Sequence, residues 1–195
     1  EALALGPGLG LGEGAKGLVL ELATNLDKPM ILDADALTLL AGNLGRLAEA
    51  KGPRILTPHP GEAGRLLGRS PAEIQNDRPR SARELASKSN SVVVLKGSHS
   101  LIANPEGFLL VNLTGGPVLA TGGSGDLLTG LIAGLLAQGL GAFQAAALGA
   151  HLHGLAADLA ASKISDRGLF PTEIQSCLPE AWKSLFSLGK DIASY

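Results

Sequence analysis

The stretch ATGGSGDLLTGLIAGLL, residues 120–136, joins a glycine-rich loop directly to an apolar helix. Three of the four residues before Asp126 are glycines, and no Asp, Glu, Lys or Arg follows Asp126 until Asp158. Leucine and isoleucine on nearly every face of the helix predict that it is buried. A loop rich in free amides that leads into such a helix is typical of an anion site at the ligand edge of an α/β sheet.

The uncharged span after Asp126, residues 127–157, is long enough to raise the question of a membrane helix. The sequence QGLG at 138–141 interrupts this span, and Gln144, His151 and His153 place polar side chains in its second half. These features favour a buried pair of helices over a membrane span.

The composition of the 195 residues indicates one globular domain over residues 1–195, with 45% hydrophobic and 17% charged residues. A net charge of -2 without a long basic run argues against nucleic-acid binding. The single cysteine, Cys177, excludes a disulfide within the chain and favours a cytoplasmic setting. No signal peptide is apparent, and residues 2–5 already have the pattern of a strand, so we expect the chain to begin inside its domain.

Short apolar segments alternate with helical patterns along the rest of the chain. Strands are expected at 2–5, 30–33, 54–57 and 91–95, and helices at 13–25, near 36–41 and from 70 onward. Ser70 and Glu73 form a capping-box pattern, and Pro79 predicts a kink or restart of the helix that they begin. This alternation predicts a mostly parallel sheet with helices on both faces, a three-layer α/β/α architecture.

Two further signals lie nearer the C-terminus. The apolar segments 101–103 and 108–111 flank the turn sequence NPEG and predict a hairpin. Thr172 with Gln175 predicts a capping box at the start of the last helix.

Four motifs follow the carboxyl ends of predicted strands, the edge where open α/β sheets bind ligands. They are GPGLG at 6–10, TPHPGE at 57–62, KGSHS at 96–100 and GGSGD at 122–126. The first is not the dinucleotide fingerprint GxGxxG, because Leu11 stands where its third glycine would be. A ligand contact and a tight turn are equally open for it. In the second, His59 stands between two prolines, which favours a rigid hydrogen-bonding group over an incidental turn residue.

The other two motifs together suit phosphoryl transfer. Lys96 offers a point charge to phosphate oxygens, and Gly97, Ser98, His99 and Ser100 offer amides and hydroxyls, although the same string also suits a solvated turn. The N–H groups of Gly123, Ser124 and Gly125 are suited to stabilise charge on a phosphoryl group, with Asp126 as the base for an attacking hydroxyl. The alternative for Asp126 is a structural acid that interacts with the helix dipole.

Six strings of the sequence, in order, resemble the ADP/ATP-dependent NAD(P)H-hydrate dehydratases, a family of the ribokinase-like superfamily. They are GPGLG, DADAL at 33–37, TPHPGE, LKG at 95–97, GGSGD and PTEI at 171–174. The resemblance implies a ribokinase-like fold and repair of hydrated NADH or NADPH: ADP or ATP, with Mg²⁺, phosphorylates the ring hydroxyl, and phosphate is then eliminated. It implies that Asp126, Gly8 and His59 contact the hydrated dinucleotide and that Lys96–Ser100 and Gly125 bind the nucleotide. No metal ligand is assigned.

The chain also departs from the family pattern. Family members have further elements before the GPG loop, and Ser100 stands where many have Thr. The resemblance further implies a homo-oligomer, a preference for ADP in bacterial members, and a possible fusion to an NAD(P)H-hydrate epimerase. Two other functions remain open: a ribokinase-like kinase for a small alcohol such as a vitamin precursor, and an inactive nucleotide-binding module.

Overall fold

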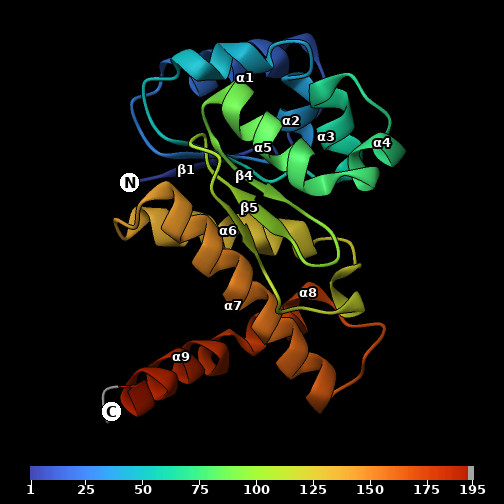
Figure 1. Ribbon diagram of the computed structural model, residues 1–195, viewed down its shortest axis with the longest axis vertical. Coiled ribbons are helices and arrows are strands. Elements are labelled where there is room, and N and C mark those ends of the chain that lie inside the picture. Colours follow the sequence, from blue (N-terminus) through green and yellow to red (C-terminus); the bar gives the residue numbers. More distant parts are fainter. Residues whose placement is uncertain (193–195) are drawn as a thin grey trace.

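A computed structural model describes residues 1–192 of the chain and the side chains of residues 1–185. Its centre is one six-stranded sheet with the strands in sequence order (Figure 1). The strands are β1 (Leu3–Leu5), β2 (Met30–Leu32), β3 (Arg54–Leu56), β4 (Val92–Leu95), β5 (Leu101–Ala103) and β6 (Leu109–Val111). The first four pair in parallel, and β5 and β6 pair antiparallel, so the predicted parallel sheet and hairpin are confirmed.

The strands β2, β3 and β4 are buried at every position, which explains their continuous apolar runs. Alternate residues belong to different cores because side chains alternate between the faces of a strand. Leu32 and Leu56 pack in one hydrophobic cluster, whereas Ile31 and Ile55 pack in another. The sheet therefore needs a helical layer on each face.

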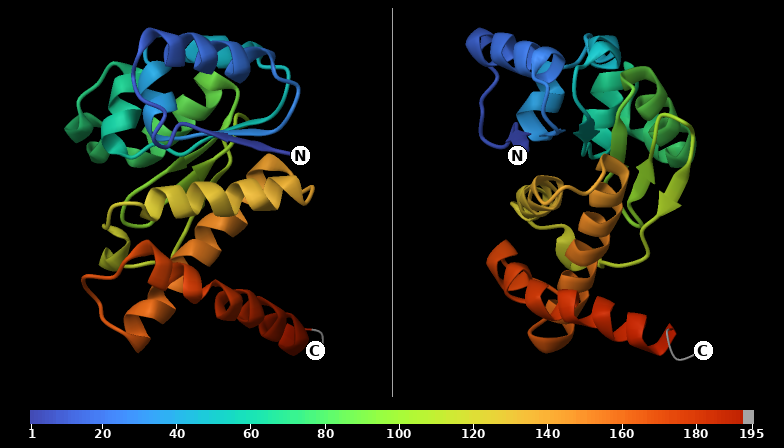
Figure 2. Two further views of the ribbon diagram at one scale, coloured as in Figure 1. Left: turned by 180° about the vertical axis from the view of Figure 1, so that it is seen from behind. Right: turned by 90° about the vertical axis from the view of Figure 1, so that its left-hand side faces the viewer.

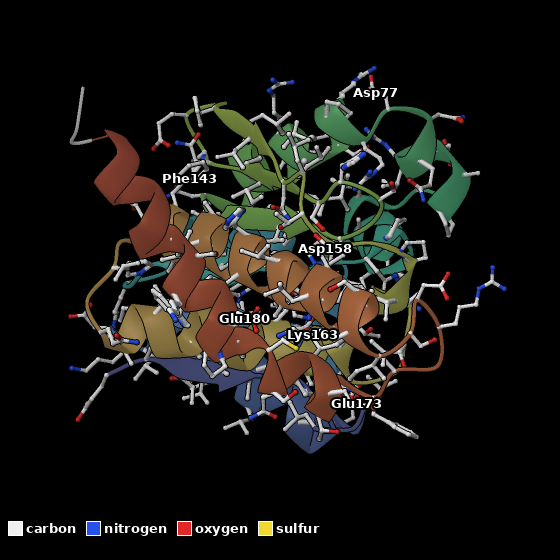
Figure 3. The ribbon with its side chains drawn as sticks, turned by 90° about the horizontal axis from the view of Figure 1, so that it is seen from below. Asp77, Phe143, Asp158, Lys163, Glu173 and Glu180 are labelled. Atoms are coloured by element: carbon white, nitrogen blue, oxygen red, sulfur yellow. The ribbon has the colours of Figure 1, made fainter. Side chains whose placement is uncertain are left out.

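One layer consists of α1 (Glu13–Asn25), α2 (Ala34–Leu39), α3 (Pro60–Leu67), α4 (Pro71–Asn76) and α5 (Arg78–Ser89). The other is formed by α6 (Ser124–Ala137) and α7 (Ala142–Lys163), while α8 (Pro171–Ser176) and α9 (Leu178–Ile192) pack on α7 (Figure 2). Short 3₁₀ helices lie at Leu44–Glu49 and Pro117–Leu119. Lys163 of α7 forms an ion pair with Glu180 of α9 (Figure 3). The three-layer prediction is confirmed.

Local signals placed several helix ends correctly. The expected helix at 13–25 coincides with α1, and Ser70 Oγ accepts the Glu73 N–H at 3.2 Å in a capping box. A new helix, α5, begins next to Pro79, at Arg78, and Asp77 caps it, as the predicted restart requires. The predicted Thr172–Gln175 box is wrong: α8 begins at Pro171, and the Glu173 carboxylate accepts the Phe170 N–H at 2.7 Å instead.

The apolar span forms the expected helix pair, with α6 and α7 joined by a short turn in which Gly139 has φ +94°. The expectation that α6 is buried on nearly every face is wrong. Leu128 and Ile132 are buried, whereas Asp126, Gly130 and Gly134 are exposed. Small residues and the lone acid make up the open side of the helix. Within residues 1–192, no helix has the length and apolarity needed to cross a membrane.

Candidate active site

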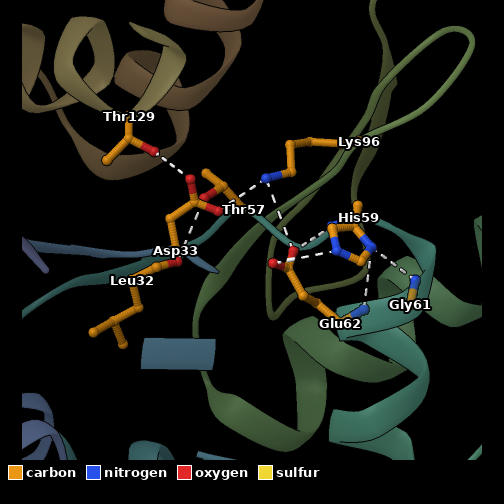
Figure 4. A network of polar contacts seen from close by, with 8 residues as sticks. All are labelled: Leu32, Asp33, Thr57, His59, Gly61, Glu62, Lys96 and Thr129. Carbon is orange, nitrogen blue, oxygen red and sulfur yellow. Dashed lines mark hydrogen bonds and ion pairs between the residues drawn. The ribbon is translucent and has the colours of Figure 1, made fainter. Parts of the chain in front are cut away.

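A network of polar side chains joins the carboxyl ends of β2, β3 and β4 to α6 (Figure 4). Asp33, directly after β2, is 1% exposed. Its Oδ1 accepts a hydrogen bond from Lys96 Nζ at 2.9 Å, and its Oδ2 accepts one from Thr129 Oγ1 at 2.8 Å. A buried carboxylate without such partners is costly, so these contacts hold Asp33 and Lys96 together at this edge of the sheet.

Lys96 also lies 3.8 Å from the Oε2 atom of Glu62, a second buried carboxylate at the start of α3. One ammonium group thus stands between two carboxylates, and the cluster of Asp33, Glu62 and Lys96 carries a net negative charge when all three are ionised. Such a cluster offers hard oxygen ligands beside a cationic group.

His59 is the N-cap of α3. Its Nδ1 accepts the N–H groups of Gly61 and Glu62 at 2.9 and 3.3 Å, and the Glu62 carboxylate accepts the His59 N–H at 2.8 Å. Because Nδ1 serves as an acceptor, a neutral His59 carries its proton on Nε2. Nε2 lies 3.4 Å from Glu62 Oε1, and half of the side chain is exposed. His59 can therefore donate to a ligand through Nε2 alone.

The GPGLG loop contacts Asp33 and Asp35, which follow β2. Gly6 has φ +133°, and a Cβ there would lie 1.8 Å from the Asp33 carbonyl oxygen, so only glycine permits this approach. The Asp35 carboxylate accepts the Gly10 N–H at 2.8 Å. Gly8 is exposed, with φ +67° and open space around its Cβ position. The predicted ligand loop therefore lies beside Asp33, with Gly8 facing outward.

A cavity of about 510 Å³ opens next to this network. It is lined by Lys96–Ser100, by the segment between β6 and α6, by the start of α6, and by His59, Ala150 and His153. Of the residues predicted from the sequence, the cavity brings together His59, Lys96, Gly97, Ser98, His99, Ser100, Ser124 and Gly125. Gly8, Gly123 and Asp126 are not among its lining residues. The predicted phosphate loop and part of the glycine motif thus share one cavity.

The start of α6 presents free amides. Gly123 is the N-cap with φ +85°, and no side chain caps the helix. The Ser124 N–H donates to the Thr121 carbonyl at 3.3 Å, and the Ser124 hydroxyl donates to the Leu119 carbonyl at 2.7 Å. Within the described part of the chain, the N–H groups of Gly123, Gly125 and Asp126 have no acceptor. Free N–H groups at a helix start favour an anion.

Gly125 is in close contact with the strand-end network. A Cβ at this position would lie 3.4 Å from Lys96 Nζ and 3.8 Å from Asp33 Oδ2. The neighbouring Asp126 is exposed, and its carboxylate forms no hydrogen bond or ion pair with the described residues. An exposed, unpaired carboxylate beside free amides is available to a substrate hydroxyl.

The cavity wall between β6 and α6 is held by α7. Asn112 Nδ2 and Thr114 Oγ1 donate to backbone carbonyls of α7 at 3.1 and 2.8 Å, and the Asp158 carboxylate accepts the Gly115 N–H at 2.9 Å. A Cβ at Gly154 of α7 would lie 2.3 Å from Thr114 Oγ1, so this contact also depends on a glycine. The wall and α7 form one packed unit.

His153 of α7 is 5% exposed, and its Nε2 has no hydrogen-bond partner within the described residues. Burial, with a smaller contribution from the positive charge of Lys96, lowers the pKa of His153 to about 4, although a hydrogen bond to the Ser124 backbone opposes the shift. His153 is therefore neutral at neutral pH, a buried group that lines the cavity together with Lys96–Ser100.

Sequence reasoning missed several of these residues. Asp33 and Glu62 lie inside motifs at predicted strand ends, so a signal for both was present. Thr129 and His153 had none, because their positions depend on how helices pack against the edge.

The comparisons with known proteins agree with this geometry. A sequence model of the NAD(P)H-hydrate dehydratase family matches residues 1–180. The bifunctional NAD(P)H-hydrate repair enzyme Nnr of Thermofilum pendens is 44% identical over 185 residues, which are 95% of this chain and 35% of that protein. The ADP-dependent (S)-NAD(P)H-hydrate dehydratase of Neisseria meningitidis is 47% identical over 161 residues, which are 81% of this chain and 54% of that protein. The chain thus spans about a third to a half of these relatives.

Solved structures show the same fold. The ADP/ATP-dependent NAD(P)H-hydrate dehydratase of Bacillus subtilis, co-crystallised with ATP and Mg²⁺, superposes with a TM-score of 0.86 at 40% identity, covering 94% of this chain and 66% of that one. A ribokinase-like superfamily protein of Enterococcus faecalis superposes with a TM-score of 0.77 at 31% identity, covering 94% of this chain and 63% of that one. The predicted ribokinase-like fold is confirmed.

Proposed function

Because the chain belongs to the NAD(P)H-hydrate dehydratase family, we propose that it is the dehydratase part of an enzyme that repairs hydrated NADH or NADPH with ADP. The observation that carries this proposal is one arrangement at the start of α6. The N–H groups of Gly123 and Gly125 have no acceptor within the described residues, the neighbouring Asp126 carboxylate is exposed, and a Cβ at Gly125 would lie 3.4 Å from Lys96 Nζ. The choice of ADP is supported by the name of the Neisseria relative.

The nucleotide would occupy the cavity, with Lys96 and the amides of the loop to Ser100 on its phosphates. The hydrated ring would approach from the side of Asp126, His59 and the GPGLG loop. His59 would donate to it through Nε2, because Nδ1 is engaged by the helix cap. The Asp126 carboxylate would take the proton from the ring hydroxyl as its oxygen attacks the terminal phosphorus of ADP.

AMP then leaves, and negative charge that develops on the phosphoryl oxygens is stabilised by Lys96 and the amides at the start of α6. In the second step the ring C–O bond breaks, phosphate departs and the neighbouring ring carbon loses a proton, which restores the ring double bond. A cavity that excludes water would protect the phosphorylated ring from hydrolysis.

The residues present fit a Mg²⁺ ion. Mg²⁺ in nucleotide sites is held by one or two carboxylates together with substrate phosphates, and Asp33 and Glu62 supply two buried carboxylates beside the cavity. When bound, the ion would neutralise phosphate charge during transfer.

Two further features of the working protein are proposed. The Thermofilum relative is named bifunctional, so we expect this dehydratase to act with an NAD(P)H-hydrate epimerase, fused or separate. We also expect a homo-oligomer. Exposed apolar side chains on and beside the edge strand β6, Phe108, Val111 and Leu113, offer a surface for a second copy.

The test uses the full-length protein that contains this chain, purified hydrated NADH or NADPH, ADP and Mg²⁺. Repair is followed by the return of the absorbance of reduced nicotinamide and by release of one AMP and one phosphate per ring. A stable phosphorylated alcohol as product would instead identify a small-molecule kinase. ADP binding without any turnover would identify an inactive nucleotide-binding module.

A further inference from the structure

Arg78, the first residue of α5, holds the loop that follows β4. Its Nη1 donates to the Ser98 carbonyl at 2.5 Å, and its Nη2 donates to the carbonyls of Leu95 and His99, each at 3.2 Å. One guanidinium group thus donates hydrogen bonds to the carbonyls of three residues within a five-residue stretch. The planar fork of arginine suits such convergent acceptors, which a single ammonium group does not match.

The direction of these carbonyls decides the direction of the neighbouring amides. In a trans peptide, the C=O of one residue and the N–H of the next point in opposite directions. The Leu95 carbonyl faces Arg78, and the Lys96 N–H accordingly points the other way, to the Pro58 carbonyl at 2.8 Å. By the same rule, the N–H groups of His99 and Ser100 point away from Arg78.

Those two amides have no acceptor within the described part of the chain, and His99 and Ser100 both line the cavity. Unpaired backbone N–H groups are rare away from water or a ligand, and successive free amides are a common phosphate-binding device. The carbonyls of Ser98 and His99, which would repel phosphate oxygens, are bound to Arg78 on the opposite side.

The loop conformation also depends on this contact. Gly97 has φ +148°, and a Cβ there would lie 2.8 Å from Arg78 Nη2. His99 has φ +53°, an unfavourable backbone conformation for a residue other than glycine. Such positions cost of order 1–3 kcal/mol each and persist only where the surroundings enforce them. Three hydrogen bonds from one side chain supply that enforcement.

Among the described side chains, no carboxylate pairs with Arg78. None of the ion pairs among the described residues involves Arg78, and its Nε is buried without a partner. Burial lowers the pKa of Arg78, with no acidic group opposing the shift. A partly buried cation held only by carbonyl dipoles favours an anion bound on the far side of the loop.

We propose that Arg78 is a positioning residue for nucleotide binding: it turns the loop carbonyls away from the cavity and so presents the amides of His99 and Ser100 to the phosphates. This inference rests on the proposed function, because it takes the cavity to be the site for ADP. Arg78 need not touch the nucleotide, and its effect reaches the phosphates through the loop and through its charge.

The test compares three variants of the full-length protein: Arg78→Met, Arg78→Lys and Arg83→Met. Arg83 lies on the same helix and donates to the Gly107 carbonyl at 3.1 Å, away from the loop, so its variant is the control for loss of an arginine. Isothermal calorimetry gives the dissociation constant and the stoichiometry for ADP. Amide hydrogen exchange, measured with and without ADP, reports the protection that bound ADP gives to residues 97–101.

We expect Arg78→Met to raise the dissociation constant for ADP by about tenfold or more, since it removes three charge-assisted hydrogen bonds that hold the loop. Arg78→Lys should recover only part of this loss, and Arg83→Met should match the wild type. Faster exchange of the loop amides should accompany the weaker binding in Arg78→Met alone. A variant that merely folds poorly would lower the stoichiometry and leave the dissociation constant unchanged.

Equal dissociation constants for the wild type and Arg78→Met would overturn the inference and leave the proposed function intact. The wild-type protein could instead bind ADP, with the loop amides protected from exchange, and yet repair no hydrated dinucleotide. That result would overturn the proposed function alone. A wild-type protein that does not bind ADP at all would contradict both.

Discussion

Asp33 and Lys96 form an ion pair, 2.9 Å long, between the end of β2 and the end of β4, in which Asp33 is buried and Lys96 is partly exposed. The two strands are separated by β3 in the sheet, so this pair joins non-adjacent strands through their side chains. The same ammonium group is the proposed phosphate ligand. Stability and binding therefore depend on one contact.

Replacing Asp33 by Asn should destabilise the fold and weaken ADP binding. The change leaves Lys96 without its closest carboxylate and Thr129 with a poorer acceptor. A loss of about 1–3 kcal/mol in the free energy of unfolding is expected for such buried polar groups. Urea denaturation measures it, with Thr129→Val as a milder control that removes one hydrogen bond. An Asp33→Asn protein as stable as the wild type would show that the pair does not hold the edge together.

Replacing Asp126 by Asn should remove turnover and spare the fold. Loss of a general base typically lowers the rate by about 10²–10⁴-fold. The side chain is exposed and unpaired within the described residues, so the free energy of unfolding should fall by no more than the helix-dipole contribution, about 0.3–1 kcal/mol. Steady-state assays with hydrated NADPH, together with calorimetry for ADP, separate the two effects. Full activity in this variant would assign the proton transfer elsewhere.

Replacing Gly125 by Ala should weaken nucleotide binding without destabilising the helix. Alanine favours a helix interior by about 1 kcal/mol over glycine, but its Cβ would lie 3.4 Å from Lys96 Nζ. We expect the KM for ADP to rise by about tenfold, because the added methyl group displaces the ammonium group or the phosphate. Gly130→Ala is the matched control, since its Cβ meets nothing within 4 Å on the exposed side of α6. If both variants behave alike, close approach at Gly125 has no role in binding.

Replacing Gly6 by Ala should be severely destabilising. The new Cβ would lie 1.8 Å from the Asp33 carbonyl oxygen, and the backbone has φ +133°. Gly10→Ala also places alanine at a positive φ, +82°, but in open space, so it should cost only about 1 kcal/mol of backbone strain. Thermal unfolding of the two variants checks the difference. Equal losses would mean that the loop moves freely away from Asp33.

Stability should fall as the pH is lowered from about 6.5 to about 4, partly through His153. The folded-state pKa of His153 is depressed to about 4, below its ordinary value of 6.5. In this window the unfolded chain binds a proton that the folded chain does not, so the free energy of unfolding decreases with falling pH by up to about 1.4 kcal/mol per pH unit. Urea denaturation across this range, for wild type and His153→Gln, should show a flatter dependence in the variant. An unchanged slope would exclude His153 as a source of the acid sensitivity.

The sequence contained most of the fold because its signals are local. The helix at 13–25 and the caps at Ser70 and Asp77 depend on neighbours within a few residues. The predicted Thr172–Gln175 box does not form. The Glu173 carboxylate instead accepts the Phe170 N–H, so the helix is capped at Phe170. The helix α6 is less buried than its leucines and Ile132 predict, because Gly130 and Gly134 lie on its open side.

The site was predictable only where its residues lie at strand ends. Lys96 and His59 meet at one edge because the parallel strands β3 and β4 end there. Gly125 reaches the same cavity at the start of α6, well after the end of β6, so the expectation that its motif directly follows a strand is wrong. His153 lines the cavity from within α7, whereas Arg78, at the start of α5, contacts the loop on the side away from the cavity. No motif distinguishes either residue from ordinary helix residues. The crossing of α5 and α7 over the sheet decides their roles.

Because the cavity wall is held by α7, a chain under synthesis should bind nucleotide only after α7 has formed. The sheet and the loop at 96–100 are complete once residue 111 has been made, but Asn112, Thr114 and Gly115 are also held in place by hydrogen bonds to α7. Because such distant contacts form after local ones, a nascent chain that ends before residue 142 would possess the phosphate loop without the enclosing wall. Nucleotide binding should therefore appear abruptly, as the second helix of the α6–α7 pair docks, and it would report the completion of folding.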